Sequence, residues 1–146
     1  MISLNNNGFF LIDREGVKLQ EVNSQLSWDF PLFVDSRNFE ENIDEKLSLG
    51  WTILDSLNPL EREAIAVIDL TEYENAKIKL KESPTWILIG GKGFQKRMKL
   101  FRANEPVFKR YGPLEYVDLR FEERIYIKPQ HIFANDFSPS YIKEAK

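Results

Sequence analysis

The sequence predicts an α+β domain: a largely antiparallel β-sheet with two helices packed on it and an exposed edge strand at its C-terminal end. Short runs in which apolar and polar residues alternate, as in half-buried strands, recur along the chain. Two longer stretches repeat apolar residues every three or four positions, as helices do. The resulting order is two strands, a helix, three strands, a second helix and two final strands.

Composition limits the size and chemistry of the domain. The chain has 146 residues, 42% of them apolar, and a net charge of −3, so we expect one packed domain that does not bind polyanions along its whole surface. It contains no cysteine and a single histidine, which excludes disulfides and thiolate metal sites, and we expect no cofactor. It has neither a signal peptide nor a run of about 18 apolar residues. It is therefore expected to be cytoplasmic, or a fragment whose targeting segment lies elsewhere.

The first half of the chain begins with a hairpin. Residues 9–12 form its first strand, and Asp13 and Gly16 fit the first and fourth positions of a type I turn before the returning strand 17–22. Residues 23–37 look like an irregular connection. A helix follows, from about residue 36 or 38 to residue 57, where Asn58 and Pro59 end it.

Three strands are expected in the middle of the chain, at residues 63–70, 76–80 and 85–89. Short connections join them, so they should be antiparallel neighbours in the sheet. No internal repeat is visible in the sequence.

A glycine-rich turn at Gly90–Gly93 leads into the second helix. It sits between a strand and a helix, where phosphate can bind, but it lacks the Walker spacing, so a tight turn with positive φ is favoured. In the helix, Phe94, Met98 and Phe101 form the buried side and Pro106 bends or interrupts it. Residues 92–110 hold seven basic side chains and one acid, which indicates a solvated face or a site for an anionic partner.

The last two strands form a hairpin. Apolar residues alternate in 114–121 and again in 124–129, with Glu122 and Glu123 between them. Pro129 has no N–H to donate, so the second strand should end there and lie at a sheet edge. An edge strand can pair with a segment of another chain. The tail, residues 130–146, is rich in aromatic residues, and it is expected to pack partly on domain 1–129 and to cover this edge when no partner is present.

Six segments in order carry a family resemblance, over roughly residues 9–129: Phe10–Val17, Phe30–Leu32, Ile87–Gly90, Lys96–Leu100, Glu105–Phe108 and Tyr116–Phe121. This ordered set resembles the C-terminal β domain of the bacterial cell-division family FtsQ/DivIB. Tyr-Val-Asp-Leu-Arg-Phe at 116–121 is the closest match. The chain departs from the family in lacking the membrane helix and the POTRA domain that precede this β domain, and in the larger residues of its last strand.

The resemblance implies a non-enzymatic scaffold that recruits FtsB/FtsL-type partners on the extracytoplasmic side of the inner membrane. Its partner would add as a strand along 124–128, with Arg120 pairing a partner carboxylate. No carboxylate motif points to catalysis, and no catalytic or metal site is expected. The alternatives are a generic binding module that uses helix 92–110 and, more remotely, a phosphate-handling enzyme at Gly90–Gly93. The expected partner-binding residues are Arg120, Phe121, Glu122, Glu123, Arg124, Ile125, Tyr126, Ile127 and Lys128.

Overall fold

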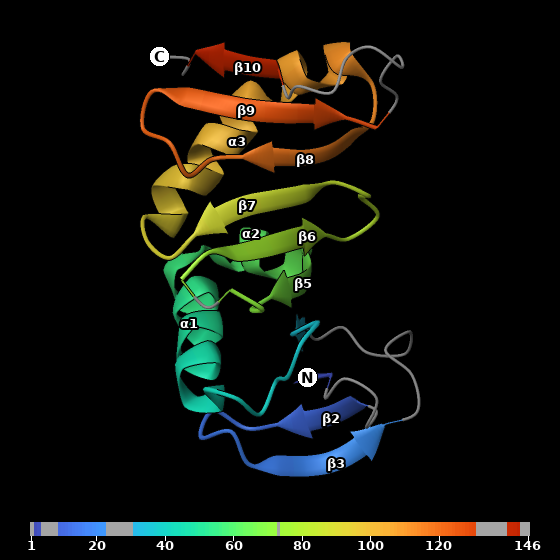
Figure 1. Cartoon of the computed structure of the whole chain (residues 1–146), viewed down its shortest axis with the longest axis vertical. Coiled ribbons are helices and arrows are strands. Elements are labelled where there is room, and N and C mark those ends of the chain that lie inside the picture. The colour runs from blue at the N-terminus through green and yellow to red at the C-terminus, as the bar shows by residue number, and fades with distance from the viewer. Residues whose placement is uncertain (1, 4–8, 23–30, 73, 131–139, 144–146) are drawn as a thin grey trace.

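The computed structural model describes residues 2–3, 9–22, 31–72, 74–130 and 140–143. Within these residues all strands join one ten-stranded sheet in the order β10-β9-β8-β7-β6-β5-β4-β1-β2-β3 (Figure 1). The strands are β1 (Ile2–Ser3), β2 (Phe9–Ile12), β3 (Lys18–Val22), β4 (Leu32–Val34), β5 (Ile65–Asp69), β6 (Ala76–Leu80), β7 (Trp86–Gly90), β8 (Leu114–Asp118), β9 (Arg124–Pro129) and β10 (Ser140–Lys143). The helices are α1 (Ile43–Ser56), α2 (Pro59–Ala64) and α3 (Phe94–Phe108), which a short 3-10 turn extends over Lys109–Tyr111.

The α+β class is confirmed. The helices contribute to one hydrophobic core with one face of the sheet, and α2 and α3 lie behind the strands in Figure 1. A row of apolar residues, one from each of six adjacent strands, forms the sheet side of this core, and each is at most 1% exposed: Phe33, Ile68, Ile78, Ile87, Val117 and Ile127. Strand alternation places these residues together, because every second side chain points to the same face.

Strand pairing is largely antiparallel, with parallel exceptions. Strands β5, β6 and β7 are antiparallel neighbours, as predicted. The expected irregular connection over 23–37 is wrong at its end, because Leu32–Val34 forms β4 and pairs in parallel with β5. Two buried residues in a run of three give too short an alternation to detect in the sequence.

The predicted helix boundaries also need correction. Helix α1 begins at Ile43, several residues later than predicted, and ends at Ser56. Pro59 occupies the start of α2, where a missing N–H costs nothing, and the Asn58 side chain accepts a hydrogen bond from the Glu61 N–H at 2.8 Å. The next strand therefore starts at Ile65 and not at residue 63. Helix α3 continues through Pro106 to Phe108 without interruption.

The sheet contains an internal repeat that the sequence reading missed. Strand, helix, parallel strand and antiparallel strand occur twice in succession, as β4-α1-β5-β6 and β7-α3-β8-β9, and the two units lie side by side in the sheet. Helix α2 is an insertion in the first unit. The motifs Ile-Asp-Leu at 68–70 and Val-Asp-Leu at 117–119 occupy equivalent places in the two units.

The repeat extends to the helix starts. Asn42 and Gly93, the residues before α1 and α3, both have left-handed backbone conformations, with φ of 55° and 65°. The fourth helical residue is basic in each unit, and it reaches back to the end of that unit's first strand. Lys46 pairs with Asp35, and Arg97 donates a hydrogen bond to the carbonyl of Ile89. None of the helices in the described residues is long and apolar enough to cross a membrane.

Candidate functional site

Strands β4, β5, β7 and β8 run in the same direction, so their carboxyl ends gather at one edge of the sheet. Three of these ends carry an aspartate that acts in the same way. Its Oδ1 accepts the backbone N–H two residues further on, at 2.7–3.1 Å, and its other oxygen pairs with a cation. The aspartate and cation pairs are Asp35 with Lys46, Asp69 with Lys77, and Asp118 with Arg120.

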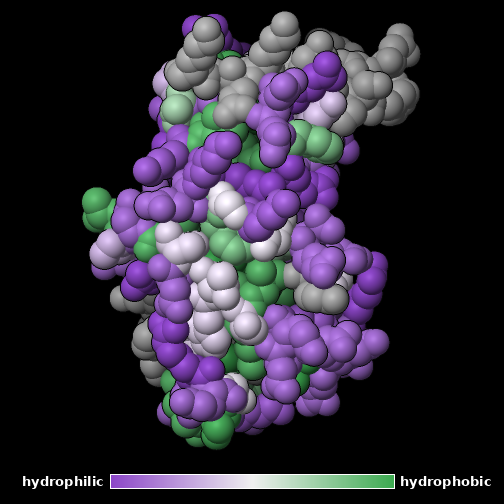
Figure 2. Space-filling view, turned by 90° about the vertical axis from the view of Figure 1, so that its left-hand side faces the viewer, coloured by the Kyte–Doolittle hydropathy of each residue, from purple (hydrophilic) through white to green (hydrophobic). Residues whose placement is uncertain are grey.

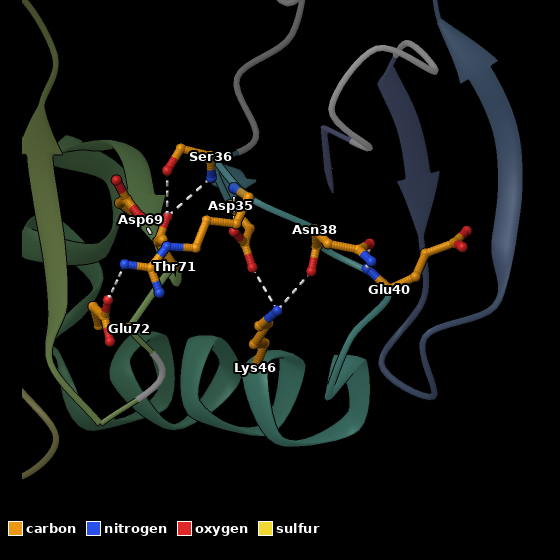
Figure 3. A network of polar contacts seen from close by, with 9 residues as sticks. Asp35, Ser36, Asn38, Glu40, Lys46, Asp69, Thr71 and Glu72 are labelled. Atoms are coloured by element: carbon orange, nitrogen blue, oxygen red, sulfur yellow. Dashed lines mark hydrogen bonds and ion pairs between the residues drawn. The ribbon is translucent and has the colours of Figure 1, made fainter.

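The most buried of these ion pairs joins α1 to the end of β4. The side chains of Lys46 and Asp35 are only 6% and 1% exposed, and the Lys46 ammonium also donates to the Asn38 carbonyl at 2.8 Å (Figure 3). A buried charge is tolerated when it is paired and hydrogen-bonded, as both partners are here. The pair therefore fixes the first turn of α1 against the edge of the sheet.

Further polar contacts tie the ends of β4 and β5 together. The Ser36 N–H donates to the Thr71 hydroxyl at 2.9 Å, and Arg37 pairs with Glu72 at 2.8 Å (Figure 3). The Thr71 N–H in turn donates to Asp69 at 2.9 Å. These contacts connect the segments that follow β4 and β5 at the carboxyl edge.

A cleft of about 800 Å³ lies where the two repeat units meet at this edge. One wall is α1, and the other is formed by the Gly90–Gly93 turn, the start of α3 and Arg120. Figure 2 faces this side of the molecule and shows pale and hydrophobic atoms in its middle, bordered by hydrophilic groups. The cleft is within the size range of ligand sites, which is about 300–1,000 Å³.

The charges in the cleft are mixed. Asp44, Glu45 and Glu74 share it with Lys92 and two arginines. Burial lowers the pKa of Arg97, which donates to backbone carbonyls of β7 and of the segment after β8. Three carboxylates and three cations thus line the cleft, which leaves no excess of positive charge to favour a polyphosphate there. The turn itself has the predicted positive φ, 78° at Gly90 and 65° at Gly93.

Arg120 lies at the corner of the cleft and is engaged within the chain. Its guanidinium donates to both carboxylate oxygens of Asp118, at 2.8 and 2.7 Å, and this hydrogen bonding raises its pKa. A partner carboxylate would therefore share this cation with Asp118. The Asp118 side chain is only 7% exposed, so its pair with Arg120 holds the end of β8 in place.

The prediction that residues 124–128 form an exposed sheet edge is wrong. Strand β9 does stop at Pro129, as predicted, but it lies between β8 and β10. Its second neighbour comes from the tail, because Ser140–Lys143 returns and pairs antiparallel with Arg124–Ile127. The tail thus covers this edge over four residues, while residues 131–139 lie outside the described part of the chain.

The other predicted partner-binding residues differ in accessibility. Ile125 and Ile127 are 0% exposed, whereas Glu122, Glu123 and Arg124 are exposed. Phe121 is 48% exposed and packs edge-on against half-buried Tyr126, with ring centroids 5.0 Å apart. Lys128 is half-buried and pairs with Glu115 at 3.0 Å. The structure therefore brings together one apolar pair at the hairpin tip and buries the isoleucines in the core.

The basic stretch forms an exposed face on α3 and the residues flanking it. Arg102 pairs with Glu105 at 2.8 Å, and no ion pair joins the other exposed cations to a described residue. These cations are Lys92, Lys96, Lys99, Lys109 and Arg110.

Sequence reasoning missed the buried Asp35–Lys46 pair and the acidic wall of the cleft. The repeated apolar-Asp-Leu motif was an available signal for the internal repeat, since it marks two strand ends that fold alike, but Asp35 is followed by serine and lies outside it. Neither the protein-family models nor the curated proteins include a match to this chain.

Proposed function

We propose that this chain is a non-enzymatic scaffold domain of the bacterial division machinery. It captures an extended segment of an FtsB/FtsL-type partner at the border of the sheet formed by β9. In this role it stands on the extracytoplasmic side of the inner membrane and is linked to the membrane by a segment outside this chain. Through its partner it connects early division proteins to septal peptidoglycan synthesis.

The FtsQ/DivIB-like segments support the proposal by their order and by the elements they occupy. The first segment, Phe10–Val17, covers most of β2 and the turn before β3, and Ile87–Gly90 lies in β7. The basic segment begins two residues into α3, and Tyr116–Phe121 covers the end of β8 and the turn after it. Three of the segments, Ile87–Gly90, Lys96–Leu100 and Tyr116–Phe121, thus lie in the second repeat unit, which carries β9.

The observation that carries the proposal is the pairing at the outer edge of β9. This edge pairs with an antiparallel strand of four residues, β10, which is the outermost strand of the sheet. Residues 130–139 separate β10 from β9 in the sequence. A short terminal strand makes few backbone hydrogen bonds and opens at low cost. A partner segment can take its place by the same backbone pairing, which is the basis of strand addition.

The test compares the full chain with a chain that ends at residue 130. Calorimetry with a synthetic FtsB/FtsL-type segment should give tighter binding to the shortened chain, because the synthetic segment no longer has to compete with β10 for the edge of β9. Circular dichroism and thermal unfolding of both chains confirm that the shortened form is folded. Equal affinity for two folded chains would exclude competition at this edge, and no binding to either would contradict the scaffold function.

A second function is favoured by the exposed cations of α3 and of the 3-10 turn that follows it. Lys96, Lys99 and Lys109 extend along the outside of the domain without ion pairs to described residues. A generic binding module would use this face for an anionic partner, and its affinity would fall steeply with salt. Replacing the three lysines by glutamine should abolish such binding and leave binding at β9 unchanged.

A further inference from the structure

The internal repeat defines what belongs beside β9. In the first unit, the last strand, β6, is followed in the sheet by β7, which is the first strand of the second unit and antiparallel to β6. In the second unit, the last strand, β9, is followed by β10, again antiparallel. The tail strand therefore occupies the position in which a third unit would begin.

The registers of the two borders agree at two successive positions, before a β-bulge between Ala76 and Lys77 shifts the first border. In the first unit Ile78 lies opposite Ile87 of the next unit. Ile127 is the counterpart of Ile78, because both end the apolar row of their unit. The residue opposite Ile127 is Ser140. The same position thus holds an isoleucine where the repeat continues and a serine where the tail substitutes for it.

We infer, on the basis of the proposed strand addition, that the edge of β9 selects an antiparallel segment with a large aliphatic residue opposite Ile127. The chain's own strand β10 pairs only weakly with that edge, because its residue opposite Ile127 is Ser140. The partner is thus an extended peptide segment with the aliphatic pattern of β7, and the tail is its built-in competitor.

Packing explains this preference. Ile127 is 0% exposed and belongs to the row of apolar residues that faces the helices. A residue directly opposite on the neighbouring strand lies about 4.5–5.5 Å away between Cβ atoms, so an aliphatic side chain extends the row. A serine adds almost no apolar area there and brings a hydroxyl that needs a hydrogen-bond partner.

The alternation of the edge fixes the rest of the pattern. The next residue of the added strand lies opposite Tyr126 and points to the other face of the sheet. The one after it lies opposite Ile125, whose side chain belongs to the buried core, so an aliphatic residue fits there too. The selected segment therefore has aliphatic residues two positions apart, as Ile87 and Ile89 are in β7.

Two synthetic peptides test the selectivity on the full chain. One copies residues 85–90, Thr-Trp-Ile-Leu-Ile-Gly, between charged flanking residues, and the other replaces only its first isoleucine, the Ile87 equivalent, by serine. The isoleucine peptide should bind about fivefold more tightly, the upper end of what one cross-strand pair contributes. Equal affinities for the two peptides would overturn the inferred selectivity.

Variants of the tail test the competitor. Ser140→Ile should strengthen β10, slow amide exchange in β9 and β10, and weaken binding of the isoleucine peptide by about fivefold. Lys143→Ile is the matched control, because it adds an aliphatic residue to the same strand opposite Arg124, on the other face. If Ser140→Ile and the control give the same amide exchange and the same peptide affinity, residue 140 does not set the strength of the β9–β10 pairing.

The same variants separate this inference from the scaffold function. An FtsB/FtsL-type segment that binds wild type and Ser140→Ile equally would leave strand addition intact and refute the role of Ser140. A segment that fails to bind the shortened chain would refute the scaffold function itself. The isoleucine peptide then still reports whether the β9 edge selects aliphatic segments.

Discussion

At the residue scale, paired charges at strand ends hold the candidate site together. Three aspartates at the carboxyl edge each cap the backbone and pair with a cation, yet they differ in burial. Asp35 is almost fully buried, whereas Asp69 and Asp118 keep 12% and 7% of their side chains exposed. The energetic consequence of breaking each pair should follow this burial, because an uncompensated charge costs more where water is excluded.

Lys46→Met tests the buried pair. It leaves the Asp35 carboxylate without its cation, so the free energy of unfolding should fall by about 3–5 kcal/mol in urea denaturation. Adding Asp35→Asn should recover much of this loss, because the amide is neutral and still accepts the Arg37 N–H. Lys99→Met, an exposed site, is the control and should change stability by at most about 0.5 kcal/mol. A Lys46→Met chain as stable as this control would show that the pair is not buried in solution.

The pair between Arg14 and Asp55 predicts a pH dependence. Two hydrogen bonds of 2.8 Å from Arg14 lower the pKa of Asp55 below its ordinary value. A folded-state pKa that is lowered adds stability above the unfolded-state pKa, about 3.9, and this stability is lost as the pH falls through the folded-state pKa. Asp55→Asn should therefore have a lower urea midpoint than wild type at pH 7, and the two should converge in acid. Since both side chains are exposed, the difference should be small and should shrink in high salt. A gap between Asp55→Asn and wild type that persists in acid would contradict the assigned cause.

At the element scale, the sequence predicted those helices and strands whose apolar residues recur regularly over several turns or positions. The alternation in 76–80 and the spacing of Phe94, Met98 and Phe101 located β6 and α3, because their apolar faces are regular and long enough. Strand β4 has only three residues, and Pro59 can either end one helix or begin another. The outer neighbour of β9 could not be predicted, because the local pattern of residues 124–129 does not show which distant segment pairs with them.

The repeat makes a prediction about helix starts. Gly93 and Asn42 occupy equivalent left-handed positions, and asparagine tolerates this conformation better than other side chains. Gly93→Asn should therefore be nearly neutral, while Gly93→Ala should lower the free energy of unfolding by about 1–2 kcal/mol. The nearest atom to an added Cβ is 3.8 Å away, so backbone strain and not a clash causes the loss. Equal stability of the two variants in thermal unfolding would contradict this.

At the scale of the whole molecule, the domain is a sheet built from two copies of one unit, bordered on one side by the β2–β3 hairpin and on the other by its own tail. Each unit relies on the next strand to cover its last strand. In the described residues the tail strand β10 takes that place beside the second unit. Under the proposed function, a partner segment would replace β10 at this edge.

Amide hydrogen exchange of the full chain, with and without a saturating FtsB/FtsL-type segment, tests strand addition most directly. Replacement of the tail should expose the amides of β10 to rapid exchange while those of β9 stay protected by the incoming strand. Unchanged exchange in β9 and β10, with new protection confined to the outer face of α3, would contradict strand addition and favour the basic helix as the binding surface.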